Sequence, residues 1–365
     1  MYHVSIETHW RIGTRGGPVM DTTSLLHLLT LIHTSGSILQ AAKVVGMSYR
    51  HAWNRLHEAE TVFGAPLIQK KRGKGATLTR LGNTLLWADR RITARLEPTL
   101  ESLSSELEGE LSRSTSDTTA PLRLYASYGF AVAALMERIN QTALPVELRY
   151  LNSMESIAAL SQKECELAGF HVPVGHFEAE TLRLFLPYLH PQELRFIHFA
   201  NLNQGLLVTR DNPKKIRKIR DLTRKGVRFV NRQVGSGTRR ILEWLLKRDH
   251  ISSAHINGFE TAEFTHAAVA AYIASNMADV GFGVETAARQ FGLDFVPVMQ
   301  ERYLFAVRRD VMEKPTMDRF LAILRSEEFR QHVNQLGGYD ATHTGRIMRL
   351  HEAFGNVTEA LPACT

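Results

Sequence analysis

The sequence predicts an α/β protein with an N-terminal winged helix-turn-helix domain, a linker helix and a larger C-terminal α/β domain. Three observations predict this order: two capped helices joined by a glycine turn, a leucine-spaced helix after them, and alternating strand-like and helix-like segments beyond. The chain has 365 residues, of which 44% are hydrophobic, so we expect more than one domain and exclude a disordered protein.

The first two helices follow from their end signals. Residues 22–35 carry apolar side chains at helical spacing, and Ser37 with Gln40 forms a capping box that begins a second, short helix ending at Gly46. Ser48 then caps a helix over Tyr49–Phe63 with a buried stripe of alanine, leucine and phenylalanine. Two helices joined by such a turn predict a helix-turn-helix, whose second helix enters a DNA major groove. The alternative is an ordinary pair of packed helices.

The N-terminal turn of this second helix offers side chains suited to base edges. Arginine pairs with guanine and asparagine with adenine. The candidate base-reading residues are Ser48, Tyr49, Arg50 and Asn54.

Residues 67–79, LIQKKRGKGATLT, predict the β-hairpin wing, because two apolar ends flank a basic, glycine-containing tip. The candidate contacts to phosphates or the minor groove are Lys70, Lys71, Arg72 and Lys74. Residues 43–80 contain eight basic and two acidic side chains, which fits DNA as the partner. A second basic cluster over 210–240, with twelve basic and two acidic residues, receives no assigned role.

The segment after the wing predicts a dimerisation helix. Five leucines recur at helical spacing, which is close to a coiled-coil seam, although the helix could instead pack on its own domain. They are Leu96, Leu100, Leu103, Leu107 and Leu111. Pro98 should kink this helix or begin a new one.

The domain boundaries follow from these segments and from a polar stretch near residue 115. We expect an N-terminal extension, a DNA-binding domain, a linker helix, a linker, a second domain and a C-terminal tail, at 1–20, 21–82, 83–112, 113–121, 122–345 and 346–365.

Two motifs in the first domain carry a resemblance to a known family. GSILQAAKVVGMSYRHAW, followed by FGAPLIQKKRGKGATLTRLG, resembles the winged helix of the molybdate-dependent repressors and, more distantly, of LysR-type regulators. The resemblance implies binding to double-stranded DNA as a homodimer or homotetramer.

The remainder alternates strands and helices, which predicts parallel strands with ligands beyond their carboxyl ends. The most informative segment is FVNRQVGSGTRR, where a strand leads through a glycine turn into a helix. Ser236, Gly237, Thr238 and Arg239 would converge there on one point, as an oxyanion or a carboxylate requires.

This segment also resembles a known family. NRQVGSGTR, THAAVAAYIASNMADVGFGVETAA and GLDFVPV resemble the periplasmic-binding-protein-like domain of molybdate- and tungstate-binding proteins. The resemblance implies two α/β lobes joined by crossing strands, with a ligand in the cleft. It assigns the turn residues above to the anion, adds the hydroxyls of Ser127 and Ser153, and places Tyr303 either in the cleft or packed on a crossing strand.

Other site classes have no support in the sequence. No HExxH, P-loop or GxSxG motif occurs, so we expect neither an enzyme nor a bound cofactor. His171 and His176 lack two further metal ligands, and His266 is better explained as a hinge or cleft residue.

Charge and localisation complete the picture. The net charge of +7 suggests an anionic partner. The absence of a long apolar run, of an apolar signal core and of a disulfide framework predicts a cytoplasmic protein that does not enter a membrane.

The sequence therefore predicts a transcriptional regulator that senses molybdate, tungstate or another small anion by closing two lobes around it. The expectation that it regulates genes of molybdenum enzymes rests only on molybdate being the ligand. A LysR-like regulator sensing a small organic carboxylate is the main alternative, and a solute-binding protein or an enzyme using the same cleft comes after it.

Overall fold

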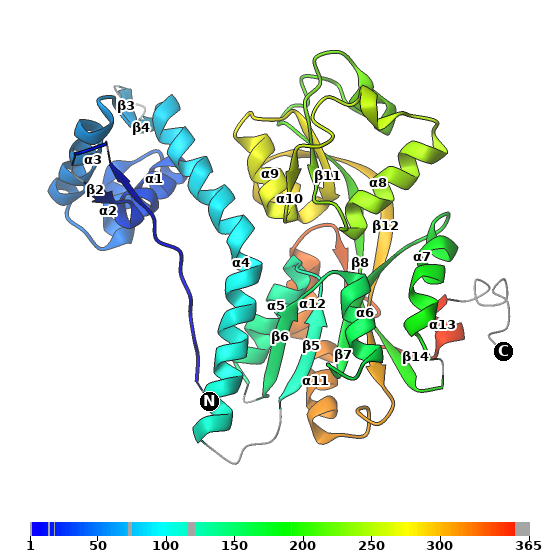
Figure 1. Cartoon of the computed structure of the whole chain (residues 1–365). Helices are drawn as coiled ribbons and strands as arrows, with labels where there is room; N and C mark the ends of the chain where they lie inside the picture. Colours follow the sequence, from blue (N-terminus) through cyan, green and yellow to red (C-terminus); the bar gives the residue numbers. More distant parts are fainter. Residues whose placement is uncertain are drawn as a thin grey trace. The chain divides into compact units, whose positions relative to one another are not determined.

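A computed structural model describes residues 2–13, 15–17, 19–71, 75–115, 121–142, 144–190 and 192–354. The chain divides into two compact units, one of Glu7–Ala94 and one of Met1–Ile6 with Arg95–Thr365. Helix α4 (Arg80–Thr115) begins in the first unit and ends in the second (Figure 1).

The smaller unit is the predicted winged helix-turn-helix. Its elements are β1 (Arg11–Gly13), β2 (Val19–Asp21), α1 (Thr23–Ser35), α2 (Ile38–Val45), α3 (Tyr49–Phe63), β3 (Ile68–Lys71) and β4 (Gly75–Leu78). The predicted caps are present, since Ser37 Oγ accepts the Gln40 N–H and Ser48 Oγ accepts the His51 N–H, at 3.3 and 3.1 Å. Gly46 ends α2 with a φ of 77°, which favours glycine.

The core of this unit confirms the predicted stripe of α3, except that Phe63 is only half-buried. Strands β1 and β2 were not predicted, because three-residue strands are too short to show alternation. Met20 is buried in the core and Trp10 packs against it. Part of the expected N-terminal extension therefore belongs to the folded unit.

Helix α4 corrects the predictions made for residues 81–121. It is one helix of 36 residues, so Pro98 does not begin a new one, and it runs three residues into the expected linker. Ser102 Oγ accepts the Tyr150 N–H at 2.9 Å and Ser105 Oγ accepts the Leu148 N–H at 2.7 Å. These bonds fix α4 along the edge strand of the neighbouring sheet by satisfying N–H groups that the sheet leaves unpaired.

The larger unit contains one ten-stranded sheet in the order β10-β9-β11-β8-β12-β7-β5-β6, with β13 and β14 also paired to β8. Its strands are β5 (Leu122–Ala126), β6 (Val146–Tyr150), β7 (Leu167–Pro173), β8 (Leu194–Val208), β9 (Phe229–Arg232), β10 (Ala262–Glu263), β11 (Val280–Val284), β12 (Asp294–Arg308), β13 (Tyr339–Asp340) and β14 (Ile347–Met348). Strand β5 is parallel to β6 and β7, and β9 is parallel to β10 and β11.

Two lobes result from this order, as predicted. Lobe 1 contains β5–β7, and lobe 2 contains β9–β11. The antiparallel strands β8 and β12, each of 15 residues, run through both (Figure 1). The helices are α5 (Phe130–Asn140), α6 (Ser153–Ser161), α7 (Glu178–Phe185), α8 (Gly237–Arg248), α9 (His266–Ala274), α10 (Glu285–Gln290), α11 (Pro315–Arg325), α12 (Glu327–Gln335) and α13 (Leu350–Phe354), with short 3₁₀ turns at Leu186–Tyr188, Ile219–Thr223 and Ser253–His255.

The crossing strands differ from their sequence patterns. The segments DFVPV and YLFAVR are two ends of the single strand β12, because irregularities at 297–299 and 303–304 interrupt its side-chain alternation. The expected tail is also partly structured, since Ala353 and Phe354 are buried against lobe 1. Residues 355–365, including Cys364, lie outside the described residues.

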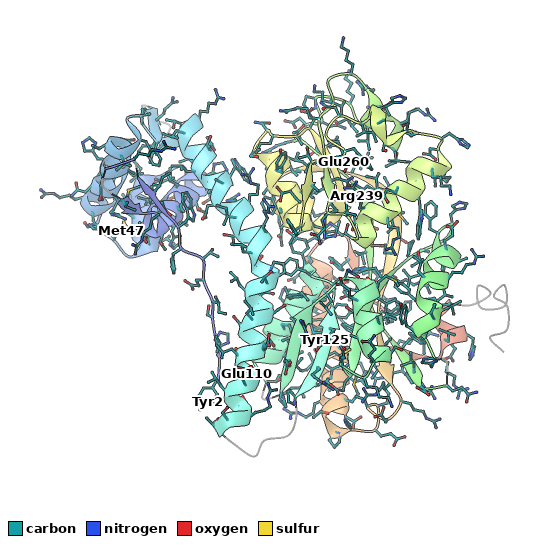
Figure 2. All side chains as sticks on the ribbon, viewed as in Figure 1. Tyr2, Met47, Glu110, Tyr125, Arg239 and Glu260 are labelled. Atoms are coloured by element: carbon teal, nitrogen blue, oxygen red, sulfur yellow. The ribbon has the colours of Figure 1, made fainter. Side chains whose placement is uncertain are left out.

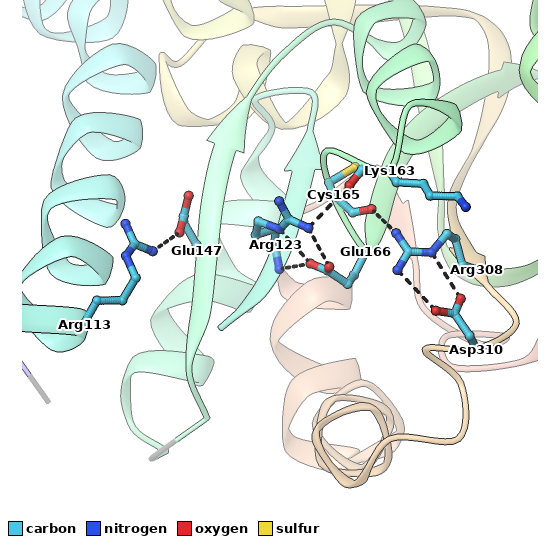
Figure 3. Close-up of polar contacts among 8 residues, drawn as sticks. All are labelled: Arg113, Arg123, Glu147, Lys163, Cys165, Glu166, Arg308 and Asp310. Atoms are coloured by element: carbon cyan, nitrogen blue, oxygen red, sulfur yellow. Dashed lines mark hydrogen bonds and ion pairs between the residues drawn. The ribbon is translucent and has the colours of Figure 1, made fainter. Parts of the chain in front are cut away.

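Ion pairs hold lobe 1 together at the amino ends of its parallel strands (Figure 3). Arg123 of β5 binds both carboxylate oxygens of Glu166, at 2.8 and 3.1 Å. Arg308 of β12 donates to the carbonyl oxygen of Cys165 at 3.1 Å, and this cysteine is buried and free. These contacts lie away from the carboxyl ends of β5 and β7.

Candidate functional site

The predicted base-reading side chains lie together at the start of α3. Ser48, Tyr49, Arg50 and Asn54 are all exposed. In the described part of the chain Arg50 forms no side-chain hydrogen bond, whereas Arg55 binds Ser24 and Glu58 and so supports the fold. Arg50 and Asn54 are therefore accessible to a groove, and Arg55 is not.

The wing has the predicted strands, with β3 paired antiparallel to β4. The backbone of Lys70 and Lys71 lies in β3, but their side chains, together with Arg72 and Lys74, lie outside what the structure describes.

A cavity of about 520 Å³ lies between the lobes, at the carboxyl ends of β5, β6 and β9 and at the N-termini of α6 and α8. A water molecule occupies about 30 Å³ in the liquid, so this cavity holds many waters. A tetrahedral oxyanion would fill only part of it, and the lobes would have to close around such a ligand.

Five of the predicted ligand-binding residues line this cavity. In lobe 1, Ser127 Oγ and Ser153 Oγ lie 3.3 Å apart, and Ser153 Oγ accepts the His171 N–H at 3.2 Å. Both hydroxyl groups therefore face the same space from two different strand ends.

The other three, Ser236, Gly237 and Thr238, line it from lobe 2. Ser236 Oγ caps α8 by accepting the Arg239 N–H at 3.2 Å. The first intrahelical bond is that of the Arg240 N–H to the Ser236 carbonyl, so the N–H groups of Gly237 and Thr238 precede it and remain available to an anion. A Cβ on Gly237 would meet nothing within 4 Å, which leaves its backbone open to the cavity.

Two predicted residues do not line the cavity. Arg239 forms ion pairs with Glu243 and Glu260, both at 3.0 Å, and its guanidinium lies 4.9 Å from the centre of the Phe259 ring (Figure 2). Tyr303 is buried, stacks on His171 with ring centres 4.0 Å apart, and donates its hydroxyl to the Ser127 carbonyl at 3.3 Å. Both are structural, because their polar groups already have partners within the protein.

Arg95, Arg232 and Arg240 line the cavity, and Arg232, the last residue of β9, is the one of the three whose guanidinium has buried atoms without a partner. Its Nε and Nη1 are buried and have no hydrogen-bond partner among the described residues. No ion pair of Arg232 is present there either. Burial lowers the pKa of Arg232 to about 10, so the side chain remains charged at neutral pH. The cavity therefore contains an unpaired cation.

Ionisable side chains around Arg232 are held neutral. Burial, together with the charge of Arg232, lowers the pKa of His171 to about 4 and that of His266 well below its ordinary value. Burial raises the pKa of Glu301 to about 8, while Gln204 Nε2 donates a hydrogen bond to its carboxyl group. All four side chains line the cavity, and the two crossing strands supply Gln204 and Glu301.

The charges in this cavity are suited to an anion. An unpaired buried charge is costly, and an oxyanion could accept bonds from the guanidinium edge, the α8 amides and the serine hydroxyls together. His266, predicted as a hinge or cleft residue, lines the cavity, whereas Arg232, one of twelve basic residues over 210–240, was not predicted. Its position at a strand end was the one available signal.

The described residues contain neither a candidate metal cluster nor a candidate membrane-spanning helix. No cluster of three or more histidine, cysteine, aspartate or glutamate side chains with metal-binding geometry occurs there. Among the same residues, no helix combines the length and the apolar character needed to cross a membrane.

Comparison with known families gives two matches. Residues 133–325 match the PBP superfamily domain, and residues 23–83 match the bacterial regulatory helix-turn-helix proteins of the lysR family. The first match covers all of lobe 2 and much of lobe 1, and the second covers α1–α3 and the wing.

Three relatives are similar to parts of the chain. An uncharacterised protein, YvgK of Bacillus subtilis, is 29% identical over 55% of this chain and 64% of its own length. The molybdenum-pterin-binding protein MopB of Rhodobacter capsulatus is 30% identical over 40% of this chain and 62% of its own. The transcriptional regulator ModE of Escherichia coli is 40% identical over 17% of this chain and 25% of its own. The chain thus spans less than two thirds of each of these relatives.

Proposed function

The chain belongs to the PBP superfamily and carries a helix-turn-helix domain of the lysR family, and from this membership we propose that it is a DNA-binding transcriptional regulator that senses a small oxyanion. The observation that supports an oxyanion as the ligand is the guanidinium of Arg232. This group is buried and has no partner among the described residues, and the N-terminus of α8 lines the same cavity. DNA is bound by α3 and the wing. The protein acts in the cytoplasm as a homodimer or homotetramer and not as an enzyme.

Molybdate and tungstate are the leading ligands in this proposal. Two relatives bear names that mention molybdenum or belong to the ModE regulators, which supports this choice. A small organic carboxylate is the rival, because one guanidinium also neutralises one carboxylate. Titration calorimetry of the full chain with molybdate, tungstate, sulfate and a series of small carboxylates decides between them. Binding of none of the oxyanions would refute the proposal, and molybdenum-enzyme genes are the expected targets if molybdate binds best.

The DNA contact gives a first prediction. Arg50→Ala should weaken binding to the specific operator by about 1–3 kcal/mol, because arginine at the start of a recognition helix pairs with a base edge. Binding to unrelated DNA should change little. Thr61→Ala, an exposed position in the last turn of α3, is the control. Fluorescence anisotropy with both DNAs measures the difference, and equal operator affinity of Arg50→Ala and wild type would show that α3 is not the base-reading helix.

Dimerisation is proposed through α4, with a second copy of α4 as the partner. Leu96, Leu103 and Leu107 are exposed by 42, 48 and 39%, and they recur at intervals of seven and four. The other two predicted leucines, Leu100 and Leu111, are half-buried within the chain itself. The seam is therefore narrower than the sequence predicted.

Helix α4 is also positioned to sense lobe closure. Ser102 and Ser105 bind it to lobe 1, whereas Arg95 reaches lobe 2, where its Nε lies 3.3 Å from Glu263 Oε2 and its guanidinium lies 5.1 Å from the centre of the Phe264 ring. A closing movement of lobe 2 must change this contact, and α4 continues from Arg95 toward the DNA-binding unit. We propose this contact as the route by which the ligand alters DNA binding.

This route gives a second prediction. Arg95→Met should reduce the effect of bound ligand on operator affinity to less than half of the wild-type effect, since lobe 2 then no longer holds α4. Arg113→Met removes a comparable ion pair of α4, that with Glu147 of lobe 1 at 3.2 Å, and should leave the effect intact (Figure 3). Operator titrations with and without saturating ligand test both variants. The proposed route would be contradicted if both variants lost the effect of bound ligand on operator affinity, or if neither variant lost it.

A further inference from the structure

The ionisable side chains around Arg232 indicate which anions the cavity accepts. This inference rests on the proposed function, in that an anion binds at Arg232. One guanidinium neutralises one negative charge, so a carboxylate needs no further compensation. A tetrahedral oxyanion such as molybdate or sulfate carries two negative charges. Arg232 alone would leave one of these charges uncompensated in a space from which closing lobes exclude water.

Two imidazoles are placed to supply the second positive charge. His171 faces the cavity from β7 of lobe 1, and His266 faces it from the first turn of α9 in lobe 2. The Nδ1 atom of each is buried and forms no hydrogen bond within the described residues. His171 Nδ1 lies 3.7 Å from Glu301 Oε2, and its ring is held by stacking on Tyr303.

These two side chains are the best placed to accept a proton. The other ionisable side chains lining the cavity are Arg95, Tyr128, Tyr150, Glu155, Arg240 and Glu301. Arg95 is paired with Glu263, Tyr128 donates to Glu97, and Glu155 accepts the Asn152 N–H in the capping box of α6. Each of these three groups already has a partner, and Arg240 is half-exposed, so that solvent screens its charge. The Nδ1 atoms of His171 and His266, in contrast, have no hydrogen-bond partner among the described residues.

We propose that the cavity binds a doubly charged tetrahedral oxyanion together with one proton, which is taken from solvent by the His171–His266 pair. Binding joins one dianion, one proton and the Arg232 cation into a neutral assembly. A monoanionic carboxylate binds without a proton. The two histidines thereby determine specificity for dianions over monoanions.

The direction of the pH dependence follows from the surroundings of the two histidines. Burial and Arg232 keep the pKa of both histidines low there, and a bound dianion must raise the pKa of at least one of them, so protons are taken up on binding. Glu301, whose pKa burial raises to about 8, is protonated at pH 7 and loses its proton above pH 8, where its carboxylate then repels the anion. Both effects make oxyanion binding weaker as pH rises.

Calorimetry of the full chain with sodium sulfate between pH 6.5 and 8, in two buffers of different ionisation enthalpy, counts the protons. We expect about one proton per sulfate and a tenfold rise in Kd per pH unit, which is the linkage expected for one proton. The double variant His171→Gln/His266→Gln should bind sulfate at least tenfold more weakly at pH 7 and without proton uptake. Glu301→Gln should keep the uptake at pH 7.

The outcomes separate this inference from the proposed function. Sulfate or molybdate binding with no proton taken up would overturn the inference and leave the oxyanion sensor intact. If no oxyanion binds to the wild-type chain at any pH, the proposed ligand class itself fails. Uptake that persists in the double histidine variant but disappears in Glu301→Gln would assign the proton to Glu301 and also overturn the inference.

Discussion

Replacing Arg232 by methionine is expected to lower oxyanion affinity at least 100-fold. Two nitrogen atoms of the guanidinium, Nε and Nη1, have no partner among the described residues, and each hydrogen bond to a charged ligand contributes roughly 1.5–3 kcal/mol. The same substitution should raise the melting temperature of the ligand-free protein, because it removes an unpaired buried cation. Calorimetry with molybdate and a thermal melt without ligand measure the two effects.

Arg239→Met is the matched control, seven residues further along the chain. Arg239 is paired with Glu243 and Glu260 outside the cavity lining, so this variant should keep the wild-type affinity and lower the melting temperature. The two arginines are thus expected to show opposite patterns. If the Arg232→Met variant bound the oxyanion with wild-type affinity, the proposed anion site would not lie in lobe 2.

The second large effect is expected on assembly. Leu103→Asp combined with Leu107→Asp should raise the dimer dissociation constant at least about 100-fold. The dimer would then bury four carboxylates, and each costs more than the roughly 1–3 kcal/mol of an unpaired uncharged polar group. Cooperative binding to paired half-sites on DNA should be lost with the dimer. Sedimentation equilibrium gives the mass of the variant directly.

Val174→Asp serves as the control for a charge placed at another exposed apolar position, since Val174 is 44% exposed and lies outside α4. It should leave the mass unchanged. If the double leucine variant also keeps the wild-type mass, the subunits associate through a surface other than the α4 seam.

The helix ends were predictable because they are local. Ser37, Ser48 and Ser236 each accept an N–H from three residues ahead, so a few neighbouring residues contain the whole interaction. The same locality explains the successful prediction of the wing hairpin and of the turn that brings Ser236, Gly237 and Thr238 into the cavity. Side chains that stay close to a helix start need no knowledge of the rest of the fold.

The docking of α4 was not predictable in this way. Its leucine spacing indicates an apolar face, but Ser102 and Ser105 bind the edge of a sheet formed more than 40 residues later. Whether a leucine is left for a second subunit depends on which face that sheet covers, and the helical period alone does not contain this information.

The sequence by itself determined the two-domain plan, the second helix of the helix-turn-helix and the helix start that lines the cavity, because caps, turns and periodicity act between residues near one another in the chain. Only the tertiary structure decided which arginine is left without a partner beside the cavity. Arg232 and Arg239 belong to the same basic segment of the sequence. Arg239 forms ion pairs with Glu243 and Glu260, whereas Arg232 lines the cavity together with His171, His266 and Glu301. Burial and pairing arise from segments far apart in sequence, and they separate a structural charge from one that needs a ligand.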